Sequence, residues 1–544
     1  MSPRNGLGDN DMQDTGNPSK TTRAAGAATG INRAEFLRLF GGLTLFAATT
    51  TVAGGRFAAA LAAGAGTLTV GISSDIKTLD PQMSTLDVFR HTIRSTVFES
   101  LVFIDPDTLQ ADPMLAEAWT LSDDGLELTF TIREGVTWHD GSPFTAGDVV
   151  YSIKRAKDPE VGSPFSAQLE PVTDVVAVDD RTVKVTLAAT TPGILSNLAV
   201  VAIVKESNIA DIGTAPIGTG PFTFVNWTPG DHIRVERYDS YYRAEQPELA
   251  AVEWRIVPDS QARLAGLQDG SLQLLALVEA KDVKQAETFA DVQVLTTKPY
   301  ILYENFNINT KRAPFDDKRV RQALAHAFDR EAYTKAVWFG LARPTINPVP
   351  EEMETYLPDS SSRYPFDLAK TEALLAEAGF SKDKPLKMEI LTIAGFDSLK
   401  SMALLLQDNL NRLGHDVTVR DLDVTVWIDR IVTNPDFDIT TDNFNTGPED
   451  AASMFNSPNF APTSNVNQWN PPGYAELLAK AVSENDKDKR IALYRELQEL
   501  VLDEMPQITV DHLPLFFLAT GGVEGLVIGP SGIDDYGQVT VEGS

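Results

Sequence analysis

The chain of 544 residues contains no cysteine, and this absence excludes several kinds of chemistry at once. Without cysteine there can be no disulfide, no thiolate nucleophile or metal ligand and no lipidated N-terminal cysteine. Histidine is scarce as well: six residues are scattered along the chain with no i, i+4 pair. The sequence therefore predicts neither a zinc site nor any other metal or cofactor.

Basic residues are few, with 46 Lys and Arg against 76 Asp and Glu and a formal net charge of −30. A surface with this balance repels phosphate backbones and anionic lipid headgroups, so we expect no nucleic-acid partner. After residue 65 no apolar run approaches the roughly 20 residues that a membrane-spanning helix needs. This pattern predicts a soluble mature protein, which we expect to be a monomer.

Motifs of common enzyme classes are also missing. The sequence has no G-x-S-x-G elbow and no G-x-x-x-x-G-K-[ST] phosphate loop. S-x-x-K occurs at 74–77 and at 381–384, but no K-T-G follows either match. These absences favour a protein that is not an enzyme, and a secreted hydrolase is the alternative from another functional class.

The first 65 residues have the pattern of a disordered N-terminus followed by an export signal. A basic segment at 32–38 precedes an apolar run at 39–55, and A-x-A sites occur at 60–62 and 63–65. The basic segment resembles a twin-arginine signal, but Ala34 stands where the second arginine belongs, so the general secretory route stays open. We expect cleavage between Ala62 and Thr67, with an uncleaved membrane anchor as the alternative.

Alternating and helical hydrophobic patterns follow one another in the remaining part of the chain. Residues 126–132 and 182–187 alternate apolar and polar side chains, which predicts half-buried strands. After a turn at 140–141, Thr145 is expected to cap a helix, with Asp148 in its first turn. Apolar residues at helical spacing predict further helices at 317–340, closed by Gly340, at 367–379 and at 489–502.

The segment Gly218–Phe222, with the sequence GTGPF, could be mistaken for a phosphate-binding loop. It lacks the third glycine of a dinucleotide-binding motif and does not open a helix. Phe222 and Phe224 instead begin an alternating pattern, which predicts a turn that runs into a strand.

Several of these segments, in this order, resemble the extracytoplasmic solute-binding proteins of ABC importers, in the peptide, nickel and opine class (family 5). The resemblance covers most of the chain between about residue 67 and residue 520. The matching segments are TLDP at 78–81, FESLV at 98–102, PMLAEAW at 113–119, the W-H-D-G turn at 138–141 with its helix start, GTGPF, YENFN at 303–307, FDDKRVRQAL at 315–324 and AKTEALLAEAGF at 369–380.

The resemblance implies an α/β fold, a two-lobed periplasmic binding protein of the class II-like, three-domain type, with mixed sheets and a hinge cleft. It places a discontinuous first lobe at 66–98, 218–296 and 512–544. A small inserted domain is expected at 99–217, and the second lobe at 297–511. A chain that crosses twice between lobes is suited to hinge closure around a ligand.

Within the second lobe, the resemblance places ligand contacts in segments rich in aromatic and amide side chains. Such residues suit a water-excluded cavity that binds a polar backbone. For Trp427 and Trp469 a place in the hydrophobic core is the alternative. The residues predicted to contact the ligand are Trp427, Thr441, Asp442, Asn443, Phe444 and Trp469.

One position departs from the family. Peptide-binding members of the family hold the ligand ammonium with an aspartate three residues after a tryptophan of the cleft. In this chain Phe444 stands at the position of that tryptophan, and Gly447 stands at the position of the aspartate. Asp442 and Asp450 are the nearest substitutes. We favour Asp442, because Asp450 is expected to cap the next helix.

Taken with the resemblance, these features predict a periplasmic receptor that delivers a peptide-sized solute to an ABC permease, with a short peptide as the expected ligand. If no carboxylate replaces the missing aspartate, an opine-like conjugate or an oligosaccharide is the alternative ligand.

Overall fold

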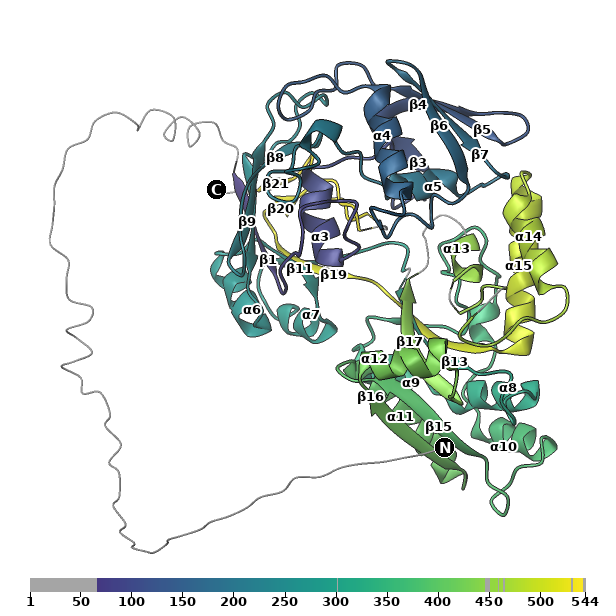
Figure 1. Cartoon of the computed structure of the whole chain (residues 1–544). Helices are drawn as coiled ribbons and strands as arrows, with labels where there is room; N and C mark the ends of the chain where they lie inside the picture. Colours follow the sequence, from purple (N-terminus) through teal and green to yellow (C-terminus); the bar gives the residue numbers. More distant parts are fainter. Residues whose placement is uncertain are drawn as a thin grey trace, which may run out of the picture. The chain divides into compact units, whose positions relative to one another are not determined.

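The structure, a computed structural model, describes residues 66–300, 302–445, 451–457, 459–462, 465–529 and 532–541. The predicted export signal therefore lies outside the described residues. Within the described part, no helix is long and apolar enough to cross a membrane. Three sheets, each with its own hydrophobic cluster, organise the chain from residue 66 onward (Figure 1).

The first sheet has seven strands, in the order β12-β19-β11-β1-β10-β9-β8, and is assembled from distant parts of the chain. β1 pairs in parallel with both β10 and β11, while the outer strands are antiparallel. Helices α6 (Ser260–Asp269) and α7 (Ala280–Ala286) follow β10 and β11. The strands are β1 (Thr67–Ile72), β8 (Phe222–Thr228), β9 (His232–Arg237), β10 (Ala251–Ile256), β11 (Leu274–Val278), β12 (Val292–Thr296) and β19 (Phe516–Thr520).

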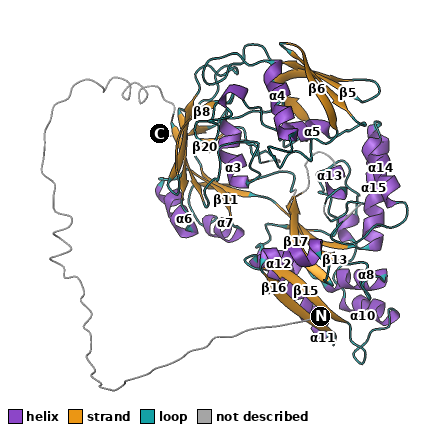
Figure 2. Ribbon diagram, viewed as in Figure 1, coloured by secondary structure: helices purple, strands orange, loops and turns teal. Residues whose placement is uncertain are grey.

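A four-stranded antiparallel sheet, β4-β5-β7-β6, lies between β1 and β8 in the sequence. Helix α4 (Ala146–Lys157) covers it, as Figure 2 also shows, and buries Val149 and Ile153 in the same cluster as the strands. The short elements β2 (Val102–Ile104), β3 (Ala111–Pro113) and α5 (Ile194–Ala199) flank it. Its strands are β4 (Ala116–Leu121), β5 (Glu127–Ile132), β6 (Val172–Asp179) and β7 (Thr182–Leu187).

The third sheet has six strands in the order β14-β18-β13-β17-β15-β16 and is mixed. β13 is antiparallel to β17 and β18, whereas β15 is parallel to β16 and β17. The strands are β13 (Leu302–Ile308), β14 (Arg343–Pro344), β15 (Lys387–Ile393), β16 (Asp416–Leu422), β17 (Ile439–Asn445) and β18 (Gln507–Leu513). The helices are α8 (Lys318–Ala327), α9 (Arg330–Val337), α10 (Leu368–Glu377), α11 (Asp397–Arg412), α12 (Val424–Ile428), α13 (Ala452–Phe455), α14 (Tyr474–Ser483) and α15 (Lys487–Glu504).

Several sequence predictions are confirmed. β5 and β7 occupy the two alternating segments, and the helices at 367–379 and 489–502 are present as α10 and α15. At the start of α4 the backbone N–H of Thr145 donates to Asp148 Oδ2 over 2.8 Å, the bond expected of a capping pair.

The single helix predicted at 317–340 is wrong, because two helices, α8 and α9, occupy the segment. The chain turns extended at Phe328, and the Asp329 side chain accepts a hydrogen bond from Ala332 N to start the second helix. Phe328 is buried against Phe306, so tertiary packing breaks a pattern that is helical on both sides. Gly340, with φ of +76°, donates its N–H to Thr334 O and closes α9.

The predicted turn and strand at Gly218–Phe222 are confirmed, and β8 begins at Phe222. A Cβ at Gly218 would lie 1.7 Å from Val97 O, and one at Gly220 would lie 2.4 Å from Thr96 O. Both glycines are needed because the backbone passes directly over another segment.

The chain passes between the seven-stranded and six-stranded sheets twice, from β12 to β13 and from β18 back to β19. Thr297 N donates to Leu515 O, and Leu515 N donates to Thr297 Oγ1 over 2.9 Å, so the two crossings are tied together. β18 ends at Leu513, two residues past the boundary expected at 511. The division into lobes and an inserted domain stays a prediction.

Candidate functional site

The central strand β13 presents two different faces. Tyr303, Asn305 and Asn307 alternate with Glu304 and Phe306, as the period of a strand requires. Phe306 belongs to the core cluster beneath α8 and α11, whereas the amide side chains lie on the opposite face. All five residues are buried, so the polar ones need partners inside the protein.

Asp442 on β17 is the partner of both asparagines. It is paired in register with Asn305, whose Nδ2 donates to Asp442 Oδ1 over 2.6 Å, and Asn307 Nδ2 donates to Oδ2 over 2.9 Å. Burial raises the pKa of Asp442 to about 7, and hydrogen bonds from Asn305, Asn307 and Asn459 offset part of that rise. Each carboxylate oxygen is therefore already engaged by an amide before any ligand is considered.

The neighbours of Asp442 on β17 differ in exposure. Thr441 is buried, with its Oγ1 3.5 Å from Leu391 O. Asn443 is exposed, and Phe444 is half-buried, with its ring centroid 6.0 Å from that of Tyr303. Asn443 and Phe444 are thus the two predicted contact residues on this strand that keep surface for a ligand.

Trp427 lies on α12 at the side of the same sheet. Its Nε1 donates to Thr440 Oγ1 over 2.7 Å, and the half-buried ring packs against two hydrophobic clusters. The structure therefore brings Trp427 close to β17, one residue from Thr441, and gives it a packing role there.

Trp469 is separated from these residues by its packing. It is 4% exposed and lies in a different cluster, between Phe460 at 6.1 Å and Tyr474 at 4.6 Å. Asn465 accepts the backbone N–H of Trp469. These contacts support the alternative that Trp469 belongs to the hydrophobic core.

The segment that carries the family difference, including Gly447 and Asp450, lies outside the described residues. The expectation that Asp450 caps the following helix therefore stays a prediction. The described part of this segment begins at Ala451, whose backbone angles are helical, and α13 follows it.

Sequence reasoning missed four buried polar residues on β13 and β18: Asn305, Asn307, Glu304 and Asp511. The signal was visible in Tyr303–Asn307, where every second residue of an expected strand is an amide or an aromatic.

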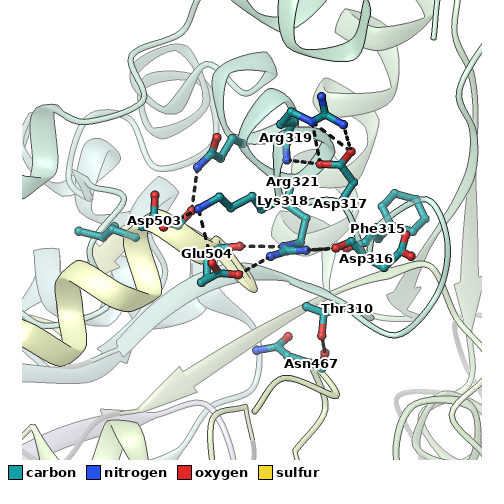
Figure 3. A network of polar contacts seen from close by, with 12 residues as sticks. Thr310, Phe315, Asp316, Asp317, Lys318, Arg319, Arg321, Asn467, Asp503 and Glu504 are labelled. Atoms are coloured by element: carbon teal, nitrogen blue, oxygen red, sulfur yellow. Dashed lines mark hydrogen bonds and ion pairs between the residues drawn. The ribbon is translucent and has the colours of Figure 1, made fainter. Parts of the chain in front are cut away.

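The motif at 315–324 forms a network of polar contacts, shown in Figure 3. Arg321 is 3% exposed and donates to the carbonyls of Phe315 and Asp316, and to the carbonyl and carboxylate of Glu504 at the end of α15. Lys318 pairs with Asp503 over 2.7 Å. The motif therefore joins α8 to α15 through paired charges and main-chain hydrogen bonds.

The W-H-D-G turn and GTGPF contact each other. His139 N donates to Gly218 O, and His139 Nε2 lies 2.9 Å from Gly220 O. Burial lowers the pKa of His139 to about 4, which keeps the ring neutral. The two motifs that best mark the family thus form one packed junction.

No group of three metal-binding side chains occurs among the residues that the structure describes. A cavity of about 210 Å³ lies elsewhere, and none of the six predicted contact residues lines it. Loop 107–111, residues 352–355 and the start of α15 surround it, with Glu354 and Lys487 forming an ion pair on its wall.

The described chain has two mixed sheets with flanking helices, which two adjacent chain crossings connect. A third sheet is inserted in the sequence between strands of the first. This is the architecture of a two-lobed periplasmic binding protein. The model of the bacterial extracellular solute-binding proteins, family 5, matches residues 110–466, and the chain belongs to that family. It is the substrate-binding component of an ABC importer.

Relatives match over most of the chain. Heme-binding protein A of Haemophilus influenzae is 31% identical over 82% of this chain and 87% of its own length. Glutathione-binding protein GsiB of Pectobacterium atrosepticum is 29% identical over 81% of this chain and 87% of its own. Di/tripeptide-binding protein 2 of Pseudomonas aeruginosa is 28% identical over 84% of this chain and 91% of its own.

Solved structures agree on the fold. HbpA2 from Haemophilus parasuis superposes with a TM-score of 0.80 at 24% identity, over 88% of this chain and 100% of its own. AgaA from A. tumefaciens R10, in complex with agropinic acid, gives a TM-score of 0.72 at 26% identity, over 88% of this chain and 99% of its own.

Proposed function

We propose that this protein captures a short peptide outside the cytoplasm and delivers it to the permease of its importer. The observation that carries the proposal is the similarity to glutathione-binding and di/tripeptide-binding relatives over more than four fifths of the chain. Amide and aromatic side chains along β13 and β17 fit the proposal, because they bond a peptide backbone and cover its side chains.

In this proposal the six predicted residues have different tasks. Asn443 and Phe444 contact the ligand, since both keep accessible surface at the end of β17. Thr441 and Asp442 hold the strand in place, Asp442 through its bonds to Asn305 and Asn307. Trp427 supports β17 through Thr440, and Trp469 supports the neighbouring segment through its ring contacts.

We also propose the lobe division 66–98, 218–296 and 512–544 against 297–511, with 99–217 inserted in the first lobe. The support is that each sheet draws its strands almost entirely from one of these sets. The tied crossings at Thr297 and Leu515 then act as the hinge.

Export completes the proposal. A signal within residues 1–65 is cleaved between Ala62 and Thr67, and the mature protein acts as a periplasmic monomer without enzymatic activity. Arg33→Lys is expected to reduce secretion if the twin-arginine route is used. Intact-mass analysis of periplasmic protein checks the cleavage site, and retention of residues before Leu61 contradicts it.

An opine-type conjugate is the second candidate ligand, favoured by the 26% identity to a protein solved with agropinic acid. It also fits a protein in which Gly447 replaces the ammonium-binding aspartate of peptide-binding family members.

Calorimetric titration with five probes separates the candidates: glutathione, Met-Leu, N-acetylated Met-Leu, agropinic acid and heme. The proposal predicts saturable one-to-one binding of at least one of the two peptides with free amines. Binding of agropinic acid alone contradicts the peptide proposal and supports an opine-type conjugate as the ligand. Binding of heme alone, or of none of the five probes, contradicts both.

A further inference from the structure

Two buried carboxyl groups lie side by side where the chain enters and leaves the six-stranded sheet. Glu304 is the third residue of β13, and Asp511 precedes the end of β18 by two residues. Both are no more than 1% exposed. Glu304 is seven residues from Thr297 and Asp511 is four residues from Leu515, the two residues whose hydrogen bonds tie the chain crossings together.

The two residues face each other at an irregularity of the ladder. Glu304 is paired with Asp511 and Asn305 with Thr509, so Val510 is an extra residue on β18. Glu304 N donates to Asp511 Oδ1 over 3.3 Å. Asp511 Oδ2 is buried and has no hydrogen-bond partner among the described residues.

The partners of Glu304 are neutral. Its Oε2 lies 2.6 Å from the Tyr333 hydroxyl and accepts from Trp338 Nε1 over 3.0 Å. The Tyr333 hydroxyl also lies 3.0 Å from Ser398 O. A hydroxyl has one proton and cannot donate to both oxygens. Both contacts are satisfied if Glu304 is protonated and donates to Tyr333, which then donates to Ser398 O.

Among the residues that the structure describes, no cation forms an ion pair with Glu304 or Asp511. Arg330 of α9 donates to the carbonyls of Ala325, Tyr364 and Thr509, and its Nη2 has no hydrogen-bond partner among the described residues. Burial lowers the pKa of His512 to about 4, so its ring is neutral. Arg343 of β14 pairs with Glu351 and Glu352, and Lys400 of α11 pairs with Asp421. Asp442 lies on the opposite face of β13. The other charged residues on these elements are exposed: Glu331, Lys335 and Asp397.

We infer that Glu304 and Asp511 together hold at least one proton at neutral pH, and that this proton keeps β13 and β18 joined at the hinge. Loss of the proton places two negative charges next to each other in a buried site without a cation. Because the strands carry both crossings, the equilibrium between lobe positions becomes linked to pH. This last step depends on the proposed lobes, whereas the protonation itself does not.

The direction of the pH effect follows from burial. Burial raises the pKa of both carboxyls, and the charge of Glu304 raises that of Asp511 further. Hydrogen bonds from Ser398, Tyr333 and Trp338 to Glu304, and from the Glu304 backbone to Asp511, offset part of the rise. A raised pKa in the folded state means that the folded protein keeps a proton which the unfolded chain releases. Stability is therefore fully present below the unfolded pKa values and falls as pH rises through the raised ones.

The protonation is tested directly by infrared spectroscopy of the whole protein. At pH 7 we expect a protonated-carboxyl band that weakens in Glu304→Gln/Asp511→Asn to the part contributed by Asp442, whereas Asp442→Asn alone keeps the part contributed by Glu304 and Asp511. A wild-type spectrum without such a band at pH 7, or an identical band in the double variant, overturns the inference.

The expected fall in stability with rising pH is tested by unfolding in urea between pH 5 and pH 9. For each linked proton, the unfolding constant of the wild type should rise by up to about tenfold per pH unit within the titration range. Glu304→Gln keeps a donor for Tyr333 and should flatten this rise. Glu504→Gln, which removes a carboxylate paired with Arg321, is the matched control and should leave the slope unchanged. Equal slopes in wild type and Glu304→Gln overturn the inference.

The hinge is tested separately, because a chain without cysteine can be labelled at introduced sites alone. Spin labels at Ser271→Cys and Asp383→Cys, both exposed positions, report the distance between the seven-stranded and six-stranded sheets. The distance distribution should change between pH 6 and pH 9 in the wild-type background and stay constant with Glu304→Gln/Asp511→Asn. If both backgrounds respond alike, or neither responds, the hinge role fails even where the carboxyl band is present.

Discussion

Two polar regions in the part of the chain between β13 and β18 handle charge in opposite ways. Between α8 and α15, Arg321 and Lys318 meet Asp503 and Glu504, so the cations have anions beside them (Figure 3). On β13, β17 and β18 the carboxyls of Glu304, Asp442 and Asp511 have amides, a phenol, an indole or each other as neighbours. The first arrangement fixes two helices at any ordinary pH, and the second responds to protons.

The difference follows from location. The α8–α15 network lies at helix ends, where surface side chains complete the pairing and the partners include main-chain carbonyls. The three strands are neighbours within the six-stranded sheet, where the side chains that bond to Glu304 and Asp442 are neutral amides, a phenol and an indole. A carboxyl there loses its water without gaining a cation, so its charged form is disfavoured.

A large loss of stability is expected when the paired charges between α8 and α15 are broken. Arg321→Ala leaves Glu504 and three carbonyls without their donor, and it should lower the free energy of unfolding by about 3 kcal/mol. Urea unfolding measures it. Arg319→Ala, in an exposed pair with Asp317, is the control and should change nothing measurable. Equal stability of the two variants would contradict the claim that Arg321 stabilises the contact between α8 and α15.

Asp442→Asn should have a smaller effect on stability, and the size of this effect depends on pH. At low pH the variant loses about 1–3 kcal/mol, because one new amide N–H faces an asparagine donor. The wild type holds a proton here up to a folded pKa of about 7, above the unfolded value, so its stability falls as pH rises through that range. Chemical unfolding at pH 5 and pH 8 should therefore show the gap between wild type and variant narrowing. A gap that widens with pH contradicts the raised pKa.

The same variant separates two views of ligand binding. If Asp442 holds the strand, free and N-acetylated Met-Leu should lose affinity equally in Asp442→Asn. If it binds a ligand amine, only the free peptide should lose affinity, by roughly 2–5 kcal/mol. Paired calorimetric titrations of both peptides decide between the two.

Phe444→Ala should weaken peptide binding by about 1–2 kcal/mol with little loss of stability, since the half-buried ring keeps surface for a ligand. Trp469→Ala is the contrast: a buried ring in a closed cluster is expected to cost about 3–5 kcal/mol of stability. Melting temperatures and titrations of both variants check this. Loss of affinity in a fully stable Trp469→Ala protein places that ring at the ligand instead.

Local patterns in the sequence predicted the local structure well. Alternation at 126–132 and at 182–187 gave β5 and β7, and the Thr145–Asp148 pair gave the start of α4, because these signals involve neighbours in the chain. The break at Phe328 was missed because its cause is a contact with Phe306, 22 residues earlier (328 − 306).

The candidate site was less accessible to such reasoning. Asp442 was selected as a free carboxylate, but its partners Asn305 and Asn307 come from a strand more than 130 positions away. Trp469 was placed near the ligand from its polar neighbours, while its ring contacts Phe460 and Tyr474. Only strand pairing and packing show which polar and aromatic groups are already engaged.

The central claim, that the protein carries a short peptide, is tested most directly by native mass spectrometry of freshly purified periplasmic protein. The account predicts a one-to-one complex whose added mass, released by denaturation, fragments as a peptide. Released masses that fragment as an opine-type or sugar conjugate, with no peptide among them, would contradict it.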